Sequence, residues 1–128
     1  MQNRNTSMTF TDKHVLVLED EPIIAFGLED MLIEEGARVV VAGSLEQARS
    51  AVAENDFDFA ILDVNVHGDN SYPFARQLLE KRVSFVFATG YGDAEHPIEL
   101  ANIPTITKPY SLAQIKEAAA KNGRGGEM

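Results

Sequence analysis

Short runs of apolar and β-branched residues recur along this chain, and stretches patterned as helices separate them. The runs lie at residues 14–18, 38–42, 57–62, 84–89 and 105–107. Each run has the length of a buried strand, and their alternation with helices predicts a parallel sheet covered on both faces. Because crossovers between parallel strands are right-handed, few topologies remain. The expected class is therefore α/β, with a doubly wound five-stranded parallel sheet.

Recognisable residues mark the starts of the helical segments. Ser44 and Ser111 are each followed three residues later by a glutamine, a capping box that satisfies backbone N–H groups at a helix start. Pro22 and Pro73 suit the first turn of a helix, where no N–H is needed. A short further helix is expected around Asp93 to Ala101, with a proline inside it. Together the elements favour the flavodoxin-like strand order 2-1-3-4-5, with about five helices.

The 128 residues are enough for one folded domain. The polar opening predicts a flexible leader over 1–12, and the Gly-rich end predicts a flexible tail over 122–128, which leaves 13–121 as the domain. The opening lacks the pattern of a signal peptide, and no apolar run is long enough to cross a bilayer. We therefore expect a cytoplasmic protein.

The composition restricts the classes of partner and of site. The formal net charge of -9 would repel phosphate backbones and anionic lipids, which argues against nucleic acid or membrane as a direct partner. The chain has no cysteine, which excludes disulfides, thiolate metal sites and a cysteine nucleophile. The expected partners are other proteins, and the chain itself is expected to be a monomer or a weak dimer.

Polar residues end or directly follow four of the five apolar runs. They are Glu19 with Asp20, then Asp63, Thr89 and Lys108. In an open parallel sheet the carboxyl ends of the strands meet at one edge, where binding sites lie. Clustered carboxylates repel one another and need protons or a hard cation such as Mg²⁺. Since a carboxylate can attack phosphorus, and an ammonium and a hydroxyl can stabilise the transferring group, these residues predict Mg²⁺-dependent phosphoryl transfer.

Four blocks carry a resemblance to a known family. VLVLEDEP, AILDVNV, FVFATG and ITKPY resemble, in this order, the signature blocks of response-regulator receiver domains, over roughly residues 13–121. The resemblance implies that Asp63 accepts a phosphoryl group from a histidine kinase or phosphotransfer protein, with Thr89 as the switch hydroxyl and Lys108 as the family lysine. The Mg²⁺ ligands that it implies are Glu19, Asp20, Asp63 and the backbone carbonyl of Asn65.

The segment FATGYG is similar to the FATGUY subgroup of receivers, which are typically single-domain proteins paired with HWE-type or related histidine kinases. Two positions depart from the broader family: His67 stands where a proline is usual, and Thr105 stands where many receivers carry an aromatic switch residue. Without that ring, the segment 90–103 is expected to change conformation instead. The residues expected in the switch and output surface are Thr89, Tyr91, Thr105, Pro109 and Tyr110.

Three other functions compete with a phosphorylation switch. A haloacid-dehalogenase-like phosphatase also uses an aspartate nucleophile, but it needs a second aspartate two residues later, where this chain has Asn65. A phosphate sink or relay intermediate would use the same site with a different output. A degenerate receiver acting as a constitutive scaffold is disfavoured because all the functional positions are present. The chain is expected not to be an enzyme beyond self-catalysed phosphotransfer and autodephosphorylation.

Overall fold

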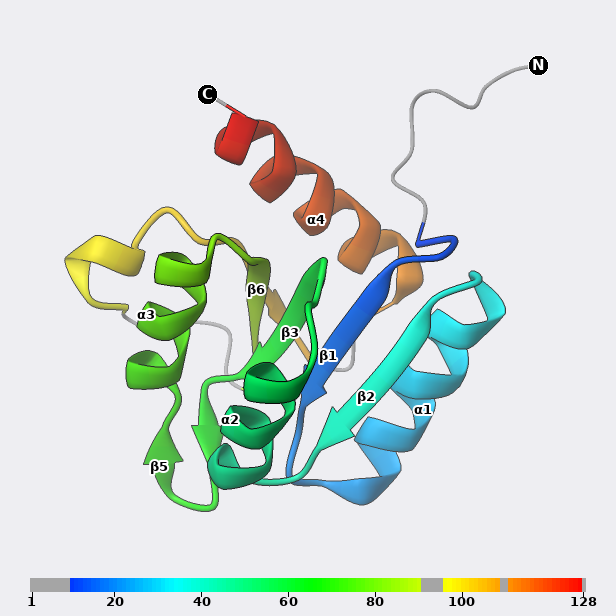
Figure 1. Ribbon diagram of the computed structural model, residues 1–128, viewed down its shortest axis with the longest axis horizontal. Helices are drawn as coiled ribbons and strands as arrows, with labels where there is room; N and C mark the ends of the chain where they lie inside the picture. The colour runs from blue at the N-terminus through cyan, green and yellow to red at the C-terminus, as the bar shows by residue number, and fades with distance from the viewer. Residues whose placement is uncertain (1–9, 91–95, 109–110, 128) are drawn as a thin grey trace.

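The computed structural model describes residues 10–90, 96–108 and 111–127, with side chains described as far as residue 121 (Figure 1). Its main sheet contains β1 (His14–Leu18), β2 (Arg38–Ala42), β3 (Phe59–Asp63), β6 (Ser84–Thr89) and β7 (Thr105–Thr107). All neighbouring strands are parallel, and their order is β2-β1-β3-β6-β7. This order confirms the predicted 2-1-3-4-5 topology.

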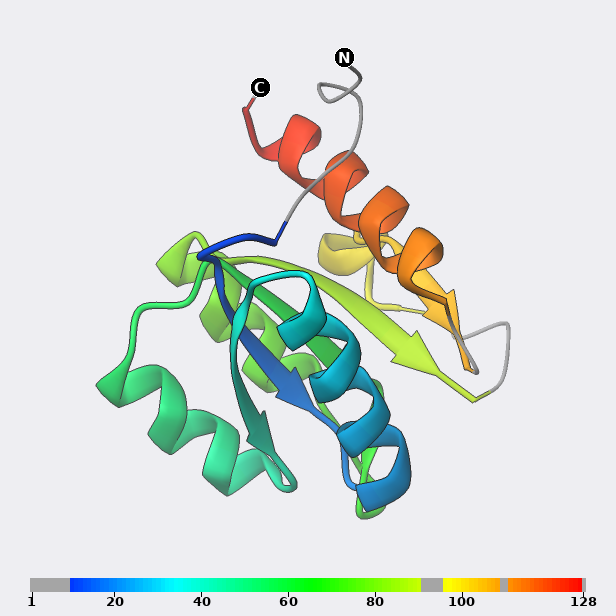
Figure 2. The same ribbon diagram turned by 90° about the vertical axis from the view of Figure 1, so that its right-hand side faces the viewer.

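Helices cover both faces of this sheet, as the buried strands require (Figure 2). They are α1 (Pro22–Glu34), α2 (Leu45–Glu54), α3 (Tyr72–Lys81) and α4 (Leu112–Glu127). One apolar cluster packs α1 and α4 against the sheet, and a second packs α2 and α3 against the opposite face. None of the described helices is both long enough and apolar enough to pass through a membrane.

Helix boundaries follow the predicted signals. Ser44 caps α2 by accepting a hydrogen bond from the backbone N–H of Gln47, and Ser111 makes the equivalent bond with Gln114. Gly36 follows the end of α1 with a φ of 92°, and a Cβ there would lie 3.1 Å from the Cα of Thr11. Both observations require glycine at this helix end.

Two features differ from the sequence-based expectations. The third strand begins at Phe59 rather than at residue 57. Asp58 instead makes two bonds to His14: its carboxylate accepts the His14 backbone N–H, and its own backbone N–H donates to the His14 carbonyl. A small antiparallel ladder, β4 (Asn65–Val66) with β5 (Asp69–Asn70), follows β3 where only a loop was expected. Helix α4 extends from Leu112 to Glu127.

The helix expected around 93–101 is wrong in its extent. The described part of that segment contains a single 3₁₀ turn, η2 (Ile98–Leu100). Pro97 precedes the turn with a ψ of 154°, and proline has no N–H with which to continue a helical hydrogen-bond ladder. Residues 91–95, which include Tyr91, lie outside the described residues, as do Pro109 and Tyr110.

Candidate functional site

The polar residues predicted at the strand ends lie together at the carboxyl edge of the sheet. Asp63 is the last residue of β3 and pairs with Ala88, which directly precedes Thr89 in β6. Glu19 follows β1, and Lys108 follows β7. Because all these strands are parallel, their carboxyl ends point to the lower edge of the molecule in Figure 1. The convergence predicted from the sequence is confirmed.

Three carboxylates form the centre of this edge. Glu19, Asp20 and Asp63 each place an oxygen within 4.8 Å of the others. Glu19 and Asp63 are only 3% and 5% exposed. Burial, and then the negative charge of Glu19, raise the pKa of Asp63 to about 6, although Lys108 and the Asn65 N–H act in the opposite direction.

Lys108 is the positive charge of the centre. Its Nζ lies 2.7 Å from Oε1 of Glu19 and 3.2 Å from Oδ2 of Asp63. Burial alone would lower the pKa of Lys108, but its bonds and Coulomb attraction to Glu19 and Asp63 outweigh burial and raise it. The lysine therefore stays charged and holds both carboxylates. Its own backbone is fixed by an N–H bond of 2.8 Å to the Thr89 carbonyl.

Each acidic residue beside Asp63 has a further partner that orients it. The second carboxylate oxygen of Glu19 accepts the backbone N–H of Glu21 at 3.0 Å. Oδ2 of Asp20 accepts the backbone N–H of His67 at 2.8 Å. Burial raises the pKa of Asp20, but this N–H and other nearby groups outweigh it, so the net shift is downward.

Ser71, which the sequence pattern did not single out, positions the end of β3. Its hydroxyl is fully buried and donates to the backbone carbonyl of Asp63 at 2.7 Å, and its N–H donates to the Val64 carbonyl at 2.9 Å. The Asn65 N–H donates to Oδ1 of Asp63 at 3.3 Å. In the sequence, Ser71 stands only as the first residue of the predicted helical segment 71–82, and nothing in the pattern shows which carbonyl its hydroxyl contacts.

A second group of polar contacts lies beyond Thr89, where the output surface was predicted. His96 is 2.9 Å from the Tyr72 hydroxyl through Nδ1 and 2.6 Å from Oγ1 of Thr105 through Nε2. Its ring also lies against Phe87, with centroids 4.5 Å apart. Burial lowers the pKa of His96. The histidine thus links α3 to β7 beside Thr105, a contact that the sequence analysis did not predict.

The donor set fits a hard divalent cation. Its side-chain donors are carboxylate oxygens, which Mg²⁺ prefers. Three carboxylates opposed by one ammonium leave an excess of negative charge in a largely buried place, and the raised pKa of Asp63 is the consequence. Glu19, Asp20 and Asp63 are therefore the residues that would hold such an ion.

Comparison with known proteins gives a consistent result. The sequence model of the response regulator receiver domain matches residues 15–120. The chain is 34% identical to SdrG from Sphingomonas melonis Fr1, with a TM-score of 0.74, covering 89% of this chain and 98% of SdrG. It is 26% identical to the response regulator TrrA of Thermotoga maritima in complex with Mg²⁺ and BeF, with a TM-score of 0.74, covering 85% and 97%.

Among curated relatives, the chain is 28% identical over 106 residues to TorR, the TorCAD operon transcriptional regulatory protein of Escherichia coli K12. The match covers 80% of this chain and 46% of TorR, so the chain spans about half the length of this relative. The shared part is therefore the receiver domain, and the match does not extend to the rest of TorR.

Proposed function

The chain belongs to the response-regulator receiver family of two-component signalling, and from that premise we propose that it acts as a phosphorylation switch. Asp63 accepts a phosphoryl group from a histidine kinase or a phosphotransfer protein in a Mg²⁺-dependent reaction. The observation that carries this proposal is the buried Asp63 carboxylate, held between Lys108 and the other acidic residues at the carboxyl edge of the sheet.

In the proposed transfer, a carboxylate oxygen of Asp63 attacks the phosphorus of a donor phosphohistidine. An O–P bond forms, the P–N bond breaks, and the donor imidazole leaves with the electron pair of that bond. With a pKa of about 6, Asp63 is mostly ionised near neutral pH and available as the nucleophile. When bound, Mg²⁺ supplies charge neutralisation for the oxygens of the transferring group.

Lys108 and Thr89 have distinct parts in this proposal. Lys108 already contacts Oδ2 of Asp63, so its ammonium lies beside the carboxylate and would offset charge on a phosphoryl group attached there. Thr89 is buried at the end of β6, one residue past the partner of Asp63. Its hydroxyl is proposed to bond a phosphoryl oxygen after transfer. The backbone carbonyl of Asn65 is proposed as a further Mg²⁺ ligand.

The proposed output runs from Thr89 into the segment 90–103. His96 ties this segment to α3 and β7, and Arg76 pairs with Glu99 in η2. A movement of the Thr89 side chain toward the phosphoryl group would therefore change several of these contacts together and shift the segment between two conformations. Tyr91, Pro109 and Tyr110 remain predicted members of the output surface. The cytoplasmic location, an HWE-type kinase and a monomeric or weakly dimeric state also remain predictions.

A phosphotransfer assay tests the acceptor. Wild type should take up acid-labile, hydroxylamine-sensitive phosphate from a phosphohistidine donor only when Mg²⁺ is present. Asp63→Asn should take up none, because its amide is not a nucleophile toward phosphorus, whereas Asp69→Asn, an exposed position in β5, should label normally. Labelling of Asp63→Asn to the wild-type extent would place the acceptor elsewhere. Steady turnover of p-nitrophenyl phosphate would instead support the phosphatase alternative.

Rapid transfer from the labelled protein to a second phosphotransfer protein would identify a relay intermediate or phosphate sink. Such a result would leave Asp63 as acceptor and change only the output. Spectra indifferent to Mg²⁺ with beryllofluoride would favour a constitutive scaffold. The TrrA receiver forms a complex with Mg²⁺ and BeF, and that similarity supports the switch over the scaffold.

A further inference from the structure

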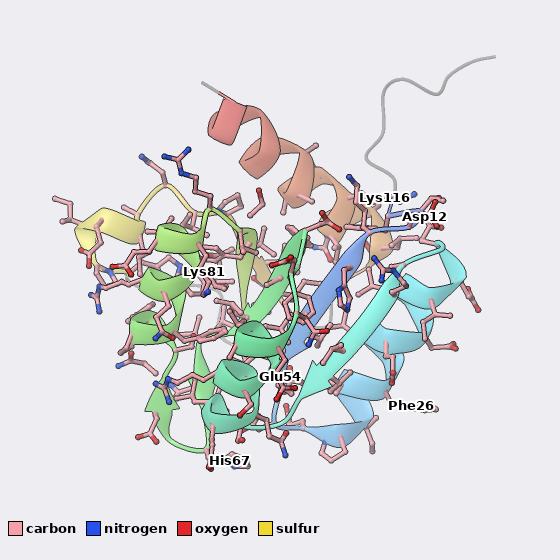
Figure 3. All side chains as sticks on the ribbon, viewed as in Figure 1. Asp12, Phe26, Glu54, His67, Lys81 and Lys116 are labelled. Carbon is pink, nitrogen blue, oxygen red and sulfur yellow. The ribbon has the colours of Figure 1, made fainter. Side chains whose placement is uncertain are left out.

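His67 occupies an unusual backbone conformation at the tip of the β4–β5 hairpin (Figure 3). The two-residue loop between the strands consists of His67 and Gly68, with φ values of 52° and 87°. Positive φ at both central positions is the requirement of a type I′ hairpin turn, in which asparagine or glycine is usual. Positive φ is uncommon for residues other than glycine, and the contacts of His67 stabilise this conformation.

Two contacts of His67 reach other loops at the carboxyl edge. Its backbone N–H donates to Oδ2 of Asp20 at 2.8 Å, and Nε2 of its ring lies 3.0 Å from the Gly43 carbonyl. Since a carbonyl only accepts, the ring contact requires the hydrogen on Nε2. His67 thereby connects the loops after β1, β2 and β3, which are far apart in sequence.

The Gly43 end of this connection is itself fixed. The Gly43 N–H donates to the side-chain oxygen of Gln47 at 2.7 Å, and Gln47 belongs to the capping box that opens α2. The ring of His67 is therefore anchored to a helix start. Its backbone N–H, from the same residue, then meets the carboxylate of Asp20.

We infer that His67 is a positioning residue for the cation site, acting through Asp20. This inference rests on the proposed Mg²⁺ role of Asp20. One oxygen of Asp20 is held by a charge-assisted bond from the His67 N–H, which fixes the plane of the carboxylate beside Glu19 and Asp63. Partners of this kind orient the ligand before the ion arrives.

The decisive group is the backbone N–H rather than the ring. A proline at position 67 could not donate this bond, and its φ near -65° would not fit the turn. The side chain of His67 is 63% exposed, so water competes for the ring contact with Gly43. The side chain of Asp20 is only 20% exposed, so its bond to the N–H is better protected.

Mg²⁺ affinity, measured by amide chemical shifts in a titration with MgCl₂, tests the inference. His67→Pro should raise the Kd at least about tenfold, as loss of an outer-shell partner does. His67→Gly keeps the N–H and accepts the positive φ, so its Kd should stay within about threefold of wild type. Gly68→Ala is the matched control, because it strains the same turn at a φ of 87° and retains the His67 N–H.

The outcomes separate this inference from the proposed function. If wild type binds no Mg²⁺, the proposed function fails. If wild type binds and His67→Pro binds equally well or more tightly, or if Gly68→Ala weakens binding as much as His67→Pro, the positioning role fails.

A second measurement decides the matter even if His67→Pro does not fold. In wild type the His67 amide proton should resonate far downfield, and Asp20→Ala should move it upfield because its acceptor is gone. An unchanged resonance would overturn the inference.

Discussion

Neutralising Asp63 should make the metal-free protein more stable, and by an amount that depends on pH. The carboxyl has a pKa of about 6 in the folded state against an ordinary value of 3.8, because of burial and the nearby Glu19. The folded state therefore holds a proton on Asp63 at pH values where the unfolded state has lost it. The free energy of unfolding that this group contributes is fully present below about pH 3.8 and is lost as the pH rises through about 6.

The size of the effect follows from the shift. About two pKa units, each worth about 1.36 kcal/mol, correspond to a loss of about 3 kcal/mol once the pH is well above 6. Asp63→Asn removes the buried negative charge but also one partner of Lys108, which keeps Glu19. We therefore expect the variant to be about 1–3 kcal/mol more stable than wild type at about pH 8.

Urea unfolding followed by circular dichroism, with EDTA present, measures this difference. Between about pH 4.5 and pH 8 the stability of Asp63→Asn relative to wild type should grow by about 2 kcal/mol. Asp69→Asn is the control, because it removes an exposed carboxylate from the neighbouring hairpin. Its stability should run parallel to that of wild type. Parallel curves for Asp63→Asn would refute the raised pKa and the argument from the buried acidic cluster.

Mg²⁺ at about 100 times its Kd should stabilise wild type by about 2.7 kcal/mol, and Asp20→Ala should lose most of this gain in thermal melts; an equal gain would remove Asp20 from the metal site. Ser71→Ala should lower the free energy of unfolding by about 1–2 kcal/mol in urea, because the buried Asp63 carbonyl loses its donor; no change would contradict that role. Arg82→Gly should raise the free energy of unfolding by about 0.5–1 kcal/mol, because Arg82 has a φ of 62° after α3. A decrease would show that the Arg82 side chain stabilises the fold more than its positive φ destabilises it. Beryllofluoride with Mg²⁺ should change amide exchange mainly within 90–103, and Thr89→Ala should weaken that change; changes confined to 63–71 would refute the proposed output route.

The sequence alone was enough to predict the sheet and the composition of its edge. Buried parallel strands read as continuous apolar runs, and the residue after each run must lie at the carboxyl edge once the strands are parallel. Glu19, Asp63, Thr89 and Lys108 could be brought together by this rule without any coordinate. The helix starts were equally readable, because a capping box is a local pattern of backbone and side chain.

The tertiary structure decided which of these groups bond to one another. Lys108 bonds Glu19 as well as Asp63, so its single positive charge is shared between two carboxylates rather than paired with Asp63 alone. The Ser71 hydroxyl, the His67 N–H and the His96 ring each find their partners on another element. Such bonds form only when the donor–acceptor distance is right to within a few tenths of an ångström, and only the assembled sheet brings these loops together. Periodicity and spacing along the chain carry no information on those distances.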